Sequence, residues 1–278
     1  MNWFSRLGVK FREIFLCQRP ASLFLLGGKI ILHELIRFLN ENFEKGGDGR
    51  LLDAGAGTRP YLSVYRDYFS TTYSFDVPYS PHDVTSVDVI ASSLHLPFRD
   101  GAFDCVLCTE VLEHIPDPLQ ALTEYQRVLK EGGKLFLTTP FFNPLHEIPH
   151  DYYRYTPFAL RYMAEKAGFR MESIVQKGGI IAFFLLFMQY LWVRFWQALS
   201  RYWHIQFLHP YNPAVYFTII LPQLVYFSKW RRRMRRNAPN SVGADIFDNL
   251  SAVTLGYVTI FSKPIRARSD QQADKSIL

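Results

Sequence analysis

Residues 143–156 hold the densest set of side chains able to do acid–base chemistry, in the order Asn-Pro-Leu-His-Glu-Ile-Pro-His-Asp-Tyr-Tyr-Arg-Tyr-Thr. We expect His150 to act as a general base oriented by Asp151, because an imidazole held by a carboxylate accepts protons near neutral pH. His146 is the second choice for the base. Arg154 would either bind an anionic substrate group or hold the loop through a carboxylate. In the purely structural alternative, Asp151 and Arg154 form a loop salt bridge and His150 caps a turn.

Four side chains of this segment also carry metal-ligating atoms: His146, Glu147, His150 and Asp151. Two histidines four residues apart can bind zinc when they lie on a helix. Pro149 disfavours a helix that runs through His150, so we predict no metal here. His114, earlier in the chain, either faces the same cleft or is a capping or packed histidine.

A second chemical signature is the sequence Leu-Leu-Asp-Ala-Gly-Ala-Gly-Thr-Arg-Pro at residues 51–60, which predicts a strand running into a glycine turn. Glycines at such a turn let the backbone approach a ligand closely. A dinucleotide site would need a third glycine, and Pro60 stands in its place. Asp53 suits a cationic ammonium group better than a pyrophosphate, and Asp76, after the next strand, can accept hydrogen bonds from ribose hydroxyls. We therefore expect the cofactor to be a cation-bearing amino-acid nucleoside.

Residues 96–115 add the pattern Leu-Pro-Phe-Arg-Asp-Gly-Ala-Phe-Asp-Cys-Val-Leu-Cys-Thr-Glu-Val-Leu-Glu-His-Ile. With the glycine turn and Asp76, this makes residues 51–169 resemble the class I S-adenosylmethionine-dependent methyltransferases, in particular the methyltransferase type 11-like group. The resemblance implies a Rossmann-like α/β three-layer sandwich with a mostly parallel seven-stranded sheet, and S-adenosyl-L-methionine as cofactor. A pattern like that of residues 150–156 recurs in family members that look like enzymes of glycan or cell-envelope biosynthesis.

The resemblance also assigns cofactor contacts residue by residue. It implies that Asp53, Gly55 and Gly57 contact the methionine part and that Asp76 binds the ribose. Ser92 and Leu94 would contact the adenine, and Thr109 and Glu110 the far side of the cofactor. Family members often carry an aspartate in place of Ser92, so adenine recognition here would rely on the backbone and Leu94. Without a ligand, the glycines would form only a tight turn and Asp76 would cap a strand end.

The scaffold for these residues is indicated by short apolar runs that alternate with helix-length segments from residue 50 onward. This alternation predicts a mostly parallel sheet with helices on both faces. The predicted strands cover residues 51–54, 72–76, 87–91, 103–108, 134–139 and 251–262, and the predicted helices cover 29–43, 118–129 and 157–167. Thr156 and Pro157 are expected to begin the helix over 157–167 and Gly168 to end it. The sequence Glu-Gly-Gly at 131–133 is expected to stop the helix over 118–129.

Two long stretches without Asp, Glu, Lys or Arg, residues 178–193 and 202–228, break this alternation. The first is short for a membrane span and three prolines interrupt the second, so an in-plane or re-entrant arrangement fits better than two crossings. Residues 229–236 then place six cations within eight residues, in a chain whose formal net charge is +6. Aromatic residues followed by cations favour an anionic membrane surface over nucleic acid, and an oligomer interface stays open.

The chain is therefore predicted to have five parts. They are an amphipathic and helical leader over 1–45, the catalytic core over 46–177, a membrane-associating insertion over 178–236, the final strand within 237–265 and a disordered tail over 266–278. The first helix of the leader either lies in a membrane interface or packs on the protein itself. Three cysteines, Cys17, Cys105 and Cys108, offer no disulfide framework and suit a reducing compartment, and the last two are expected to be packed in a strand.

Together these patterns predict an S-adenosylmethionine-dependent methyltransferase on the cytoplasmic side of a membrane. Its acceptor would be lipid-linked or of the cell-envelope glycan type. A non-catalytic membrane-bound scaffold with the same fold is the alternative, although a scaffold has no need of the ribose-binding carboxylate Asp76. A nicotinamide-dependent oxidoreductase is disfavoured by the missing third glycine.

Overall fold

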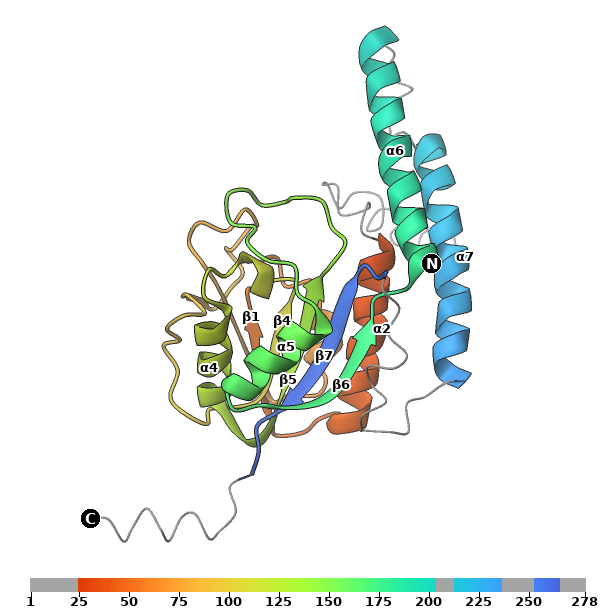
Figure 1. Cartoon of the computed structure of the whole chain (residues 1–278). Coiled ribbons are helices and arrows are strands. Elements are labelled where there is room, and N and C mark those ends of the chain that lie inside the picture. Colours follow the sequence, from red (N-terminus) through yellow and green to blue (C-terminus); the bar gives the residue numbers. More distant parts are fainter. Residues whose placement is uncertain (1–24, 204–212, 237–252, 266–278) are drawn as a thin grey trace, which may run out of the picture. The chain divides into compact units, whose positions relative to one another are not determined.

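The computed structural model describes residues 25–203, 213–236 and 253–265 of the 278-residue chain (Figure 1). Within them the chain forms two compact units. The sheet unit holds residues 31–179 and 253–265, and the helical unit holds residues 25–30, 180–203 and 213–236. The predictions for the first helix of the leader and for the C-terminal tail lie outside the described residues.

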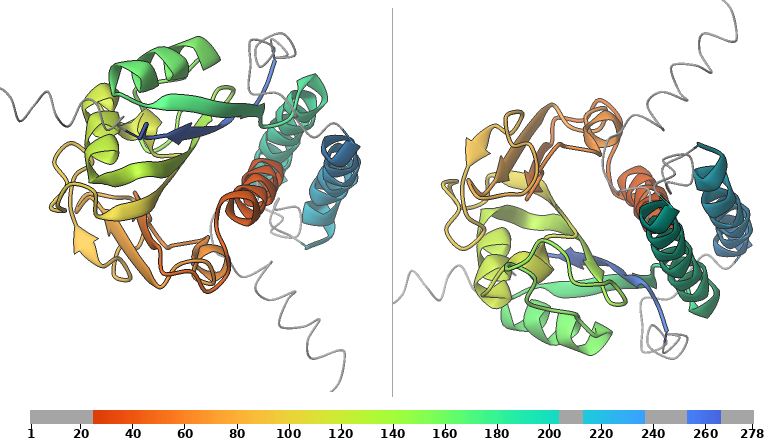
Figure 2. Two further views of the ribbon diagram at one scale, coloured as in Figure 1. Left: turned by 90° about the horizontal axis from the view of Figure 1, so that it is seen from below. Right: turned by 90° about the horizontal axis from the view of Figure 1, so that it is seen from above.

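The sheet unit contains a seven-stranded sheet, counted within the described residues, with the order β3-β2-β1-β4-β5-β7-β6. Its strands are β1 (Arg50–Ala54), β2 (Thr71–Asp76), β3 (Val89–Ile90), β4 (Phe103–Thr109), β5 (Leu129–Pro140), β6 (Arg170–Gln176) and β7 (Gly256–Ser262). Neighbouring strands are parallel except that β7 runs antiparallel to both β5 and β6. Helices cover both faces of this sheet (Figure 2). The predicted Rossmann-like fold class is thereby confirmed.

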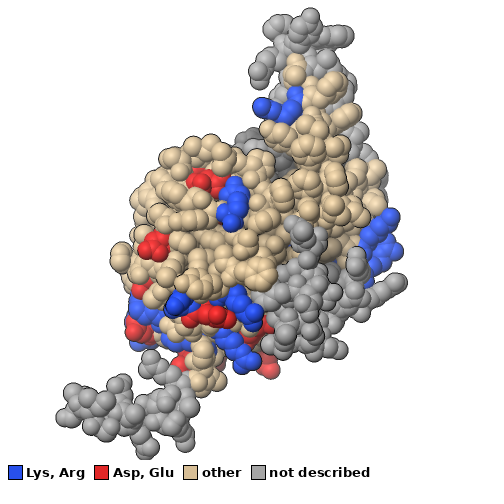
Figure 3. All heavy atoms as spheres, in the orientation of Figure 1, with Lys and Arg blue, Asp and Glu red and all other residues tan. Residues whose placement is uncertain are grey.

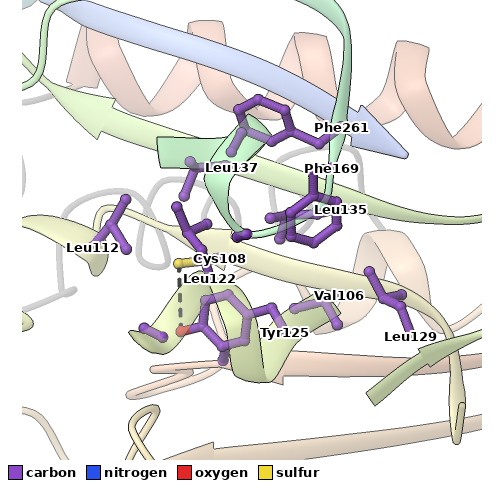
Figure 4. Close-up of a cluster of buried hydrophobic side chains, with 14 of the residues drawn as sticks. Val106, Cys108, Leu112, Leu122, Tyr125, Leu129, Leu135, Leu137, Phe169 and Phe261 are labelled. Carbon is purple, nitrogen blue, oxygen red and sulfur yellow. Dashed lines mark hydrogen bonds between the residues drawn. The ribbon is translucent and has the colours of Figure 1, made fainter. Parts of the chain in front are cut away.

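Two apolar cores lie on the two faces of the sheet. The helices of this unit are α2 (Leu25–Asn42) from residue 31 onward, α3 (Leu62–Tyr65), the short 3-10 helix η2 (Leu112–His114), α4 (Pro118–Val128) and α5 (Pro157–Lys166). Successive residues of β4 point to opposite faces, as strand geometry requires. Cys105 and Leu107 therefore pack in the core with residues of α2 and α3, whereas Val106 and Cys108 pack with α4 and α5 (Figure 4). Burial raises the pKa of both thiols, which are packing groups as predicted.

The two best-patterned helices begin at the predicted residues. The Thr156 side chain accepts a hydrogen bond from the main-chain N–H of Ala159 at 3.1 Å, and Asp117 does the same for Gln120 at 3.0 Å. Each helix then has proline in its first turn, where a missing N–H costs nothing.

The prediction that Glu-Gly-Gly at 131–133 stops α4 is wrong. The helix already ends at Val128, and Leu129 begins the long strand β5, where its side chain is fully buried. The two glycines lie inside β5, within a stretch where its register with β4 shifts. Burial of Leu129 in the core outweighs the local turn signal. The residue pattern also does not predict strand β6, because Arg170 and Glu172 interrupt its N-terminal half and only one of its positions, Ile174, is buried.

The helical unit contains α6 (Ile180–Trp203) and α7 (Pro213–Arg236), which lie side by side (Figures 1 and 2). Gln223 of α7 donates a hydrogen bond to Gln189 of α6, and both side chains are buried. Pro222 lies inside α7. In the space-filling view, the described surface of these helices is largely uncharged, whereas acidic and basic side chains gather on the sheet unit (Figure 3). Among the described residues, no helix is both long enough and apolar enough to cross a membrane.

Candidate active site

The glycine turn after β1 brings the backbone close to a second loop. Gly55 and Gly57 have φ values of 63° and 49°, in the left-handed region that favours glycine. A Cβ atom on Gly55 would lie 2.5 Å from Cγ1 of Val111, which is closer than carbon atoms can approach. The turn therefore needs glycine at position 55 for two independent reasons.

Asp53 provides a buried carboxylate at the carboxyl end of β1. Its side chain accepts a hydrogen bond from the Tyr65 hydroxyl at 2.8 Å, and only 2% of the residue is exposed. Burial raises the pKa of Asp53 to about 7, although the Tyr65 hydrogen bond and the charge of Arg59 oppose the rise. A nearby cation would favour the ionised form, so this position fits the ammonium group for which it was predicted.

Asp76 connects the end of β2 to the glycine turn. One carboxylate oxygen accepts a hydrogen bond from the main-chain N–H of Gly57, and the other from that of Val77, both at 2.7 Å. These are the contacts of a strand-end cap. Each oxygen keeps a second lone pair, so the same carboxylate can also accept ribose hydroxyls.

The turn assigned to adenine is held by its own hydrogen bonds. The Ser92 hydroxyl accepts the main-chain N–H of Leu94 at 3.2 Å, and the Leu94 carbonyl accepts the side-chain amide of Gln120 at 3.1 Å. Ser92 therefore shapes the turn, and recognition of adenine by the backbone and the half-buried Leu94 stays a prediction.

Glu110, directly after β4 and Thr109, is held in an unusual conformation. Its φ is 55°, and its main-chain N–H donates to both the carbonyl and the hydroxyl of Thr138 at 3.1 Å. The Lys177 ammonium group donates to both carboxylate oxygens of Glu110 at 2.6 Å, and Lys177 is only 3% exposed. A Cβ atom on Gly256 would lie 2.4 Å from Cε of Lys177, so this glycine makes room for the lysine. No sequence signal connected Lys177 to the site.

We expect Lys177→Met to lower the free energy of unfolding by roughly 3 kcal/mol, because it leaves the Glu110 carboxylate without its cation. The double variant Lys177→Met/Glu110→Gln should recover most of this loss. Lys130→Met, which breaks the exposed pair of Lys130 with Asp104, should cost less than about 1 kcal/mol. Denaturant unfolding measures all three. A Lys177→Met loss no larger than that of Lys130→Met would show that the pair is structurally unimportant.

The loop after β5 is organised by Asp151, whose side chain is almost fully buried. The Arg154 guanidinium donates to its two oxygens at 2.6 and 2.8 Å and holds its pKa at about 2. Asp151 also accepts the main-chain N–H of His146 at 3.0 Å and lies 3.3 Å from Nδ1 of that ring. The prediction that Asp151 orients His150 is therefore wrong, since Asp151 contacts His146 instead. Of the two roles predicted for Arg154, the structure shows the one that holds the loop.

His150 has other neighbours. Its Nδ1 lies 3.1 Å from the Tyr152 hydroxyl, and its ring centroid lies 5.0 Å from that of Tyr79. Its main-chain carbonyl accepts a hydrogen bond from Nδ1 of His114 at 2.7 Å. His150 thus presents a half-buried imidazole between aromatic rings, and its role as base remains a prediction.

The sequence did not suggest the grouping of Glu113, His114 and His146. Glu113 and His114 lie in η2 after β4, and His146 lies in the loop after β5. One ligating atom from each lies within 4.8 Å of the others. The two strands are neighbours in the sheet, so their carboxyl ends bring together residues more than 30 positions apart.

A glycine turn and two carboxylates at the ends of β1 and β2, in a mostly parallel sheet, define a nucleoside-binding α/β protein. The methyltransferase domain family matches residues 28–174, which is more than half of the chain. The chain belongs to this family. Its membership confirms the prediction of S-adenosyl-L-methionine as cofactor, and the buried Asp53, the tight turn at Gly55 and the carboxylate of Asp76 fit that molecule.

Individual relatives cover only parts of the chain. An uncharacterized protein of Methanocaldococcus jannaschii is 37% identical over 110 residues, which are 38% of this chain and 48% of that protein. The ubiquinone biosynthesis O-methyltransferase of Dechloromonas aromatica is 36% identical over 154 residues, covering 45% of this chain and 66% of the enzyme. The chain thus spans about half the length of the first of these relatives.

Solved structures with similar folds are more distant in sequence. The YcgJ protein of Bacillus subtilis is 15% identical with a TM-score of 0.48, covering 84% of this chain and 100% of that one. A SAM-dependent methyltransferase of Aquifex aeolicus is 18% identical with a TM-score of 0.44, covering 60% and 91%.

Proposed function

We propose that this chain transfers a methyl group from S-adenosyl-L-methionine to a lipid-linked or cell-envelope glycan acceptor, at the cytoplasmic face of a membrane. Membership of the methyltransferase domain family is the observation that carries the reaction. The ubiquinone biosynthesis O-methyltransferases among its relatives support an oxygen as the accepting atom.

The bound cofactor supplies a methyl group on a positively charged sulfur, ready for in-line displacement. What remains for the protein is to align the acceptor and remove its proton. His150 is suited to accept that proton, because its ring is accessible and lies among the aromatic side chains of Tyr79 and Tyr152. The charge that forms on the imidazole would be stabilised by the Tyr79 ring, whose centroid lies 5.0 Å away, and by the Tyr152 hydroxyl beside Nδ1. His146, held by Asp151, is the second choice.

The exposed apolar surface of α6 supports the membrane location. Ile180, Phe184, Phe187 and Leu191 recur at helical spacing and are 44–52% exposed. Cations follow in α7, where Lys229, Arg231 and Arg232 are exposed. An apolar helix face followed by cations is the pattern of a helix lying in an anionic interface. A lipid-linked acceptor would then share the surface that holds the enzyme.

Vesicle flotation tests the location. We expect the full chain to float with vesicles of anionic phospholipid, and the variant Phe184→Gln/Phe187→Gln/Leu191→Gln to bind them at least tenfold more weakly, since each buried apolar side chain contributes roughly 2 kcal/mol. The matched control Phe158→Gln/Tyr162→Gln removes two exposed aromatic residues of α5 and should float like the wild type. Wild-type protein that stays unbound, or equal flotation of all three, would contradict the membrane location.

Transfer of a labelled methyl group tests the reaction itself. Labelled S-adenosyl-L-methionine incubated with the protein and a bacterial membrane extract should label a lipid-extractable product, and His150→Ala should slow labelling by about 100-fold or more. A chain that binds the cofactor but labels no product in any extract would favour the non-catalytic scaffold. Equal labelling by His150→Ala would remove His150 from the proposed chemistry.

A further inference from the structure

The buried carboxylate of Glu113 accepts no hydrogen bond from the residues that the structure describes. Glu113 is 0% exposed. Burial raises the pKa of Glu113 well above its ordinary range, and the charge of Glu110 raises it further. Buried carboxylates are otherwise almost always paired, hydrogen-bonded or bound to a metal. Glu113 therefore either stays protonated or meets a cation that enters the site.

His114 turns one ring nitrogen toward this carboxylate. Its Nδ1 lies 2.7 Å from the carbonyl of His150, which can only accept a hydrogen bond, so Nδ1 carries the proton. Nε2 then holds a free lone pair, and it lies 3.7 Å from Oε1 of Glu113.

His146 has the same arrangement. Its Nδ1 faces two acceptors, the Pro144 carbonyl at 3.1 Å and Asp151 at 3.3 Å, so this nitrogen carries the proton. Nε2 is then the free ligand atom, 4.0 Å from Oε1 of Glu113. The Asn143 amide also lies 3.5 Å from Nδ1, and exchanging its oxygen and nitrogen would give its unpartnered oxygen a donor.

We propose that Glu113, His114 and His146 bind one divalent transition-metal cation of the zinc class. Two imidazole nitrogens and one carboxylate oxygen suit zinc or iron better than magnesium or calcium, which prefer oxygen ligands. Ligand atoms around one zinc ion lie roughly 3–3.5 Å apart, so the three groups need to close by about 1 Å. Asp151 behind His146 and the His150 carbonyl behind His114 are the second layer of hydrogen bonds that fixes metal-binding histidines.

Neighbouring carboxylates are already engaged. Glu110 is paired with Lys177, and Glu147, whose Oε2 lies 3.7 Å from Nε2 of His114, is bonded through Oε1 to His82 at 3.0 Å. Three protein ligands leave one position of a tetrahedral zinc open. If the proposed function holds, the acceptor oxygen would occupy this open position. The metal ion would then lower the pKa of the acceptor hydroxyl, whose proton His150 would remove.

Metal titration of the purified full chain, stripped with EDTA, tests the site without cofactor or acceptor. We expect one Zn²⁺ per chain by calorimetry, and Co²⁺ to give the visible absorption of a low-symmetry, four-coordinate site. Glu113→Gln and His146→Ala should each weaken binding on the order of 100-fold, and Asp151→Asn by roughly 10-fold to 100-fold. The matched control His150→Ala keeps the carbonyl that holds His114 and should bind Zn²⁺ within about threefold of wild type.

The metal-free melting temperature shows whether the variants fold. Glu113→Gln removes a buried carboxylate, so we expect it to melt at or above the wild-type temperature while losing the stabilisation by Zn²⁺. No Zn²⁺ binding by the wild type, or equal binding by Glu113→Gln and His146→Ala to that of the wild type, would overturn the proposal. Cofactor titration of the same samples separates the two proposals, because Zn²⁺ binding without S-adenosyl-L-methionine binding would remove only the proposed function.

Discussion

Asp53→Asn should weaken the binding of S-adenosyl-L-methionine by roughly 100-fold, because it removes the buried negative charge at the end of β1 that would face a cationic group. Asparagine keeps the size of the side chain and an oxygen for the Tyr65 hydroxyl. Asp76→Ala should also lose binding, since it removes the carboxylate that holds the glycine turn and is predicted to bind the ribose. Calorimetric titration of wild type and both variants measures the effect.

The same carboxylate should make cofactor binding depend on pH. The pKa of Asp53 is raised to about 7, so most of it is neutral at pH 6 and ionised at pH 8. Wild-type affinity should therefore rise roughly tenfold between these values, and Asp53→Asn should show no such rise. In the absence of cofactor, the stability of the fold should depend on pH in the opposite direction. The folded state binds the Asp53 proton more tightly than the unfolded state, so this group makes stability fall from about pH 4 to pH 7. Wild-type affinity in Asp53→Asn would contradict the assigned role.

Gly55→Ala should destabilise the protein by roughly 3 kcal/mol and abolish cofactor binding. About 1–2 kcal/mol comes from forcing alanine into the left-handed region at φ 63°. Overpacking against Val111, whose Cγ1 would lie 2.5 Å from the new Cβ, adds about 1–3 kcal/mol. Denaturant unfolding and cofactor titration measure the two effects.

Two further variants separate these causes. Gly101 has φ 62°, but a Cβ atom added there would have no neighbouring atom within 4 Å, so Gly101→Ala should show only the backbone cost. In the double variant Gly55→Ala/Val111→Ala, most of the overpacking cost should disappear, because both Cγ atoms are removed and only Cβ of residue 111, at 3.1 Å, stays close. The backbone cost should stay. If Gly55→Ala were no less stable than Gly101→Ala, the close approach of the two loops would have no energetic weight.

Local patterns predicted most of the elements correctly. The apolar runs at 51–54, 72–76 and 103–108 agree with β1, β2 and β4 to within one residue at each end. The caps at Asp117 and Thr156 set the starts of α4 and α5, because a side-chain acceptor next to free main-chain N–H groups acts within one turn. Where a local signal competed with burial, burial prevailed, as at Leu129.

The sequence by itself determined the class of cofactor, since Asp53, the glycine turn and Asp76 act through strand ends whose positions follow from chain order. Only the tertiary structure decided which groups face one another. Asp151 contacts His146 rather than its neighbour His150, and Lys177 reaches Glu110 across 67 positions. Pairing of β4 with β5 brings His146 beside Glu113. Such contacts depend on strand order and side-chain direction, which no local spacing specifies.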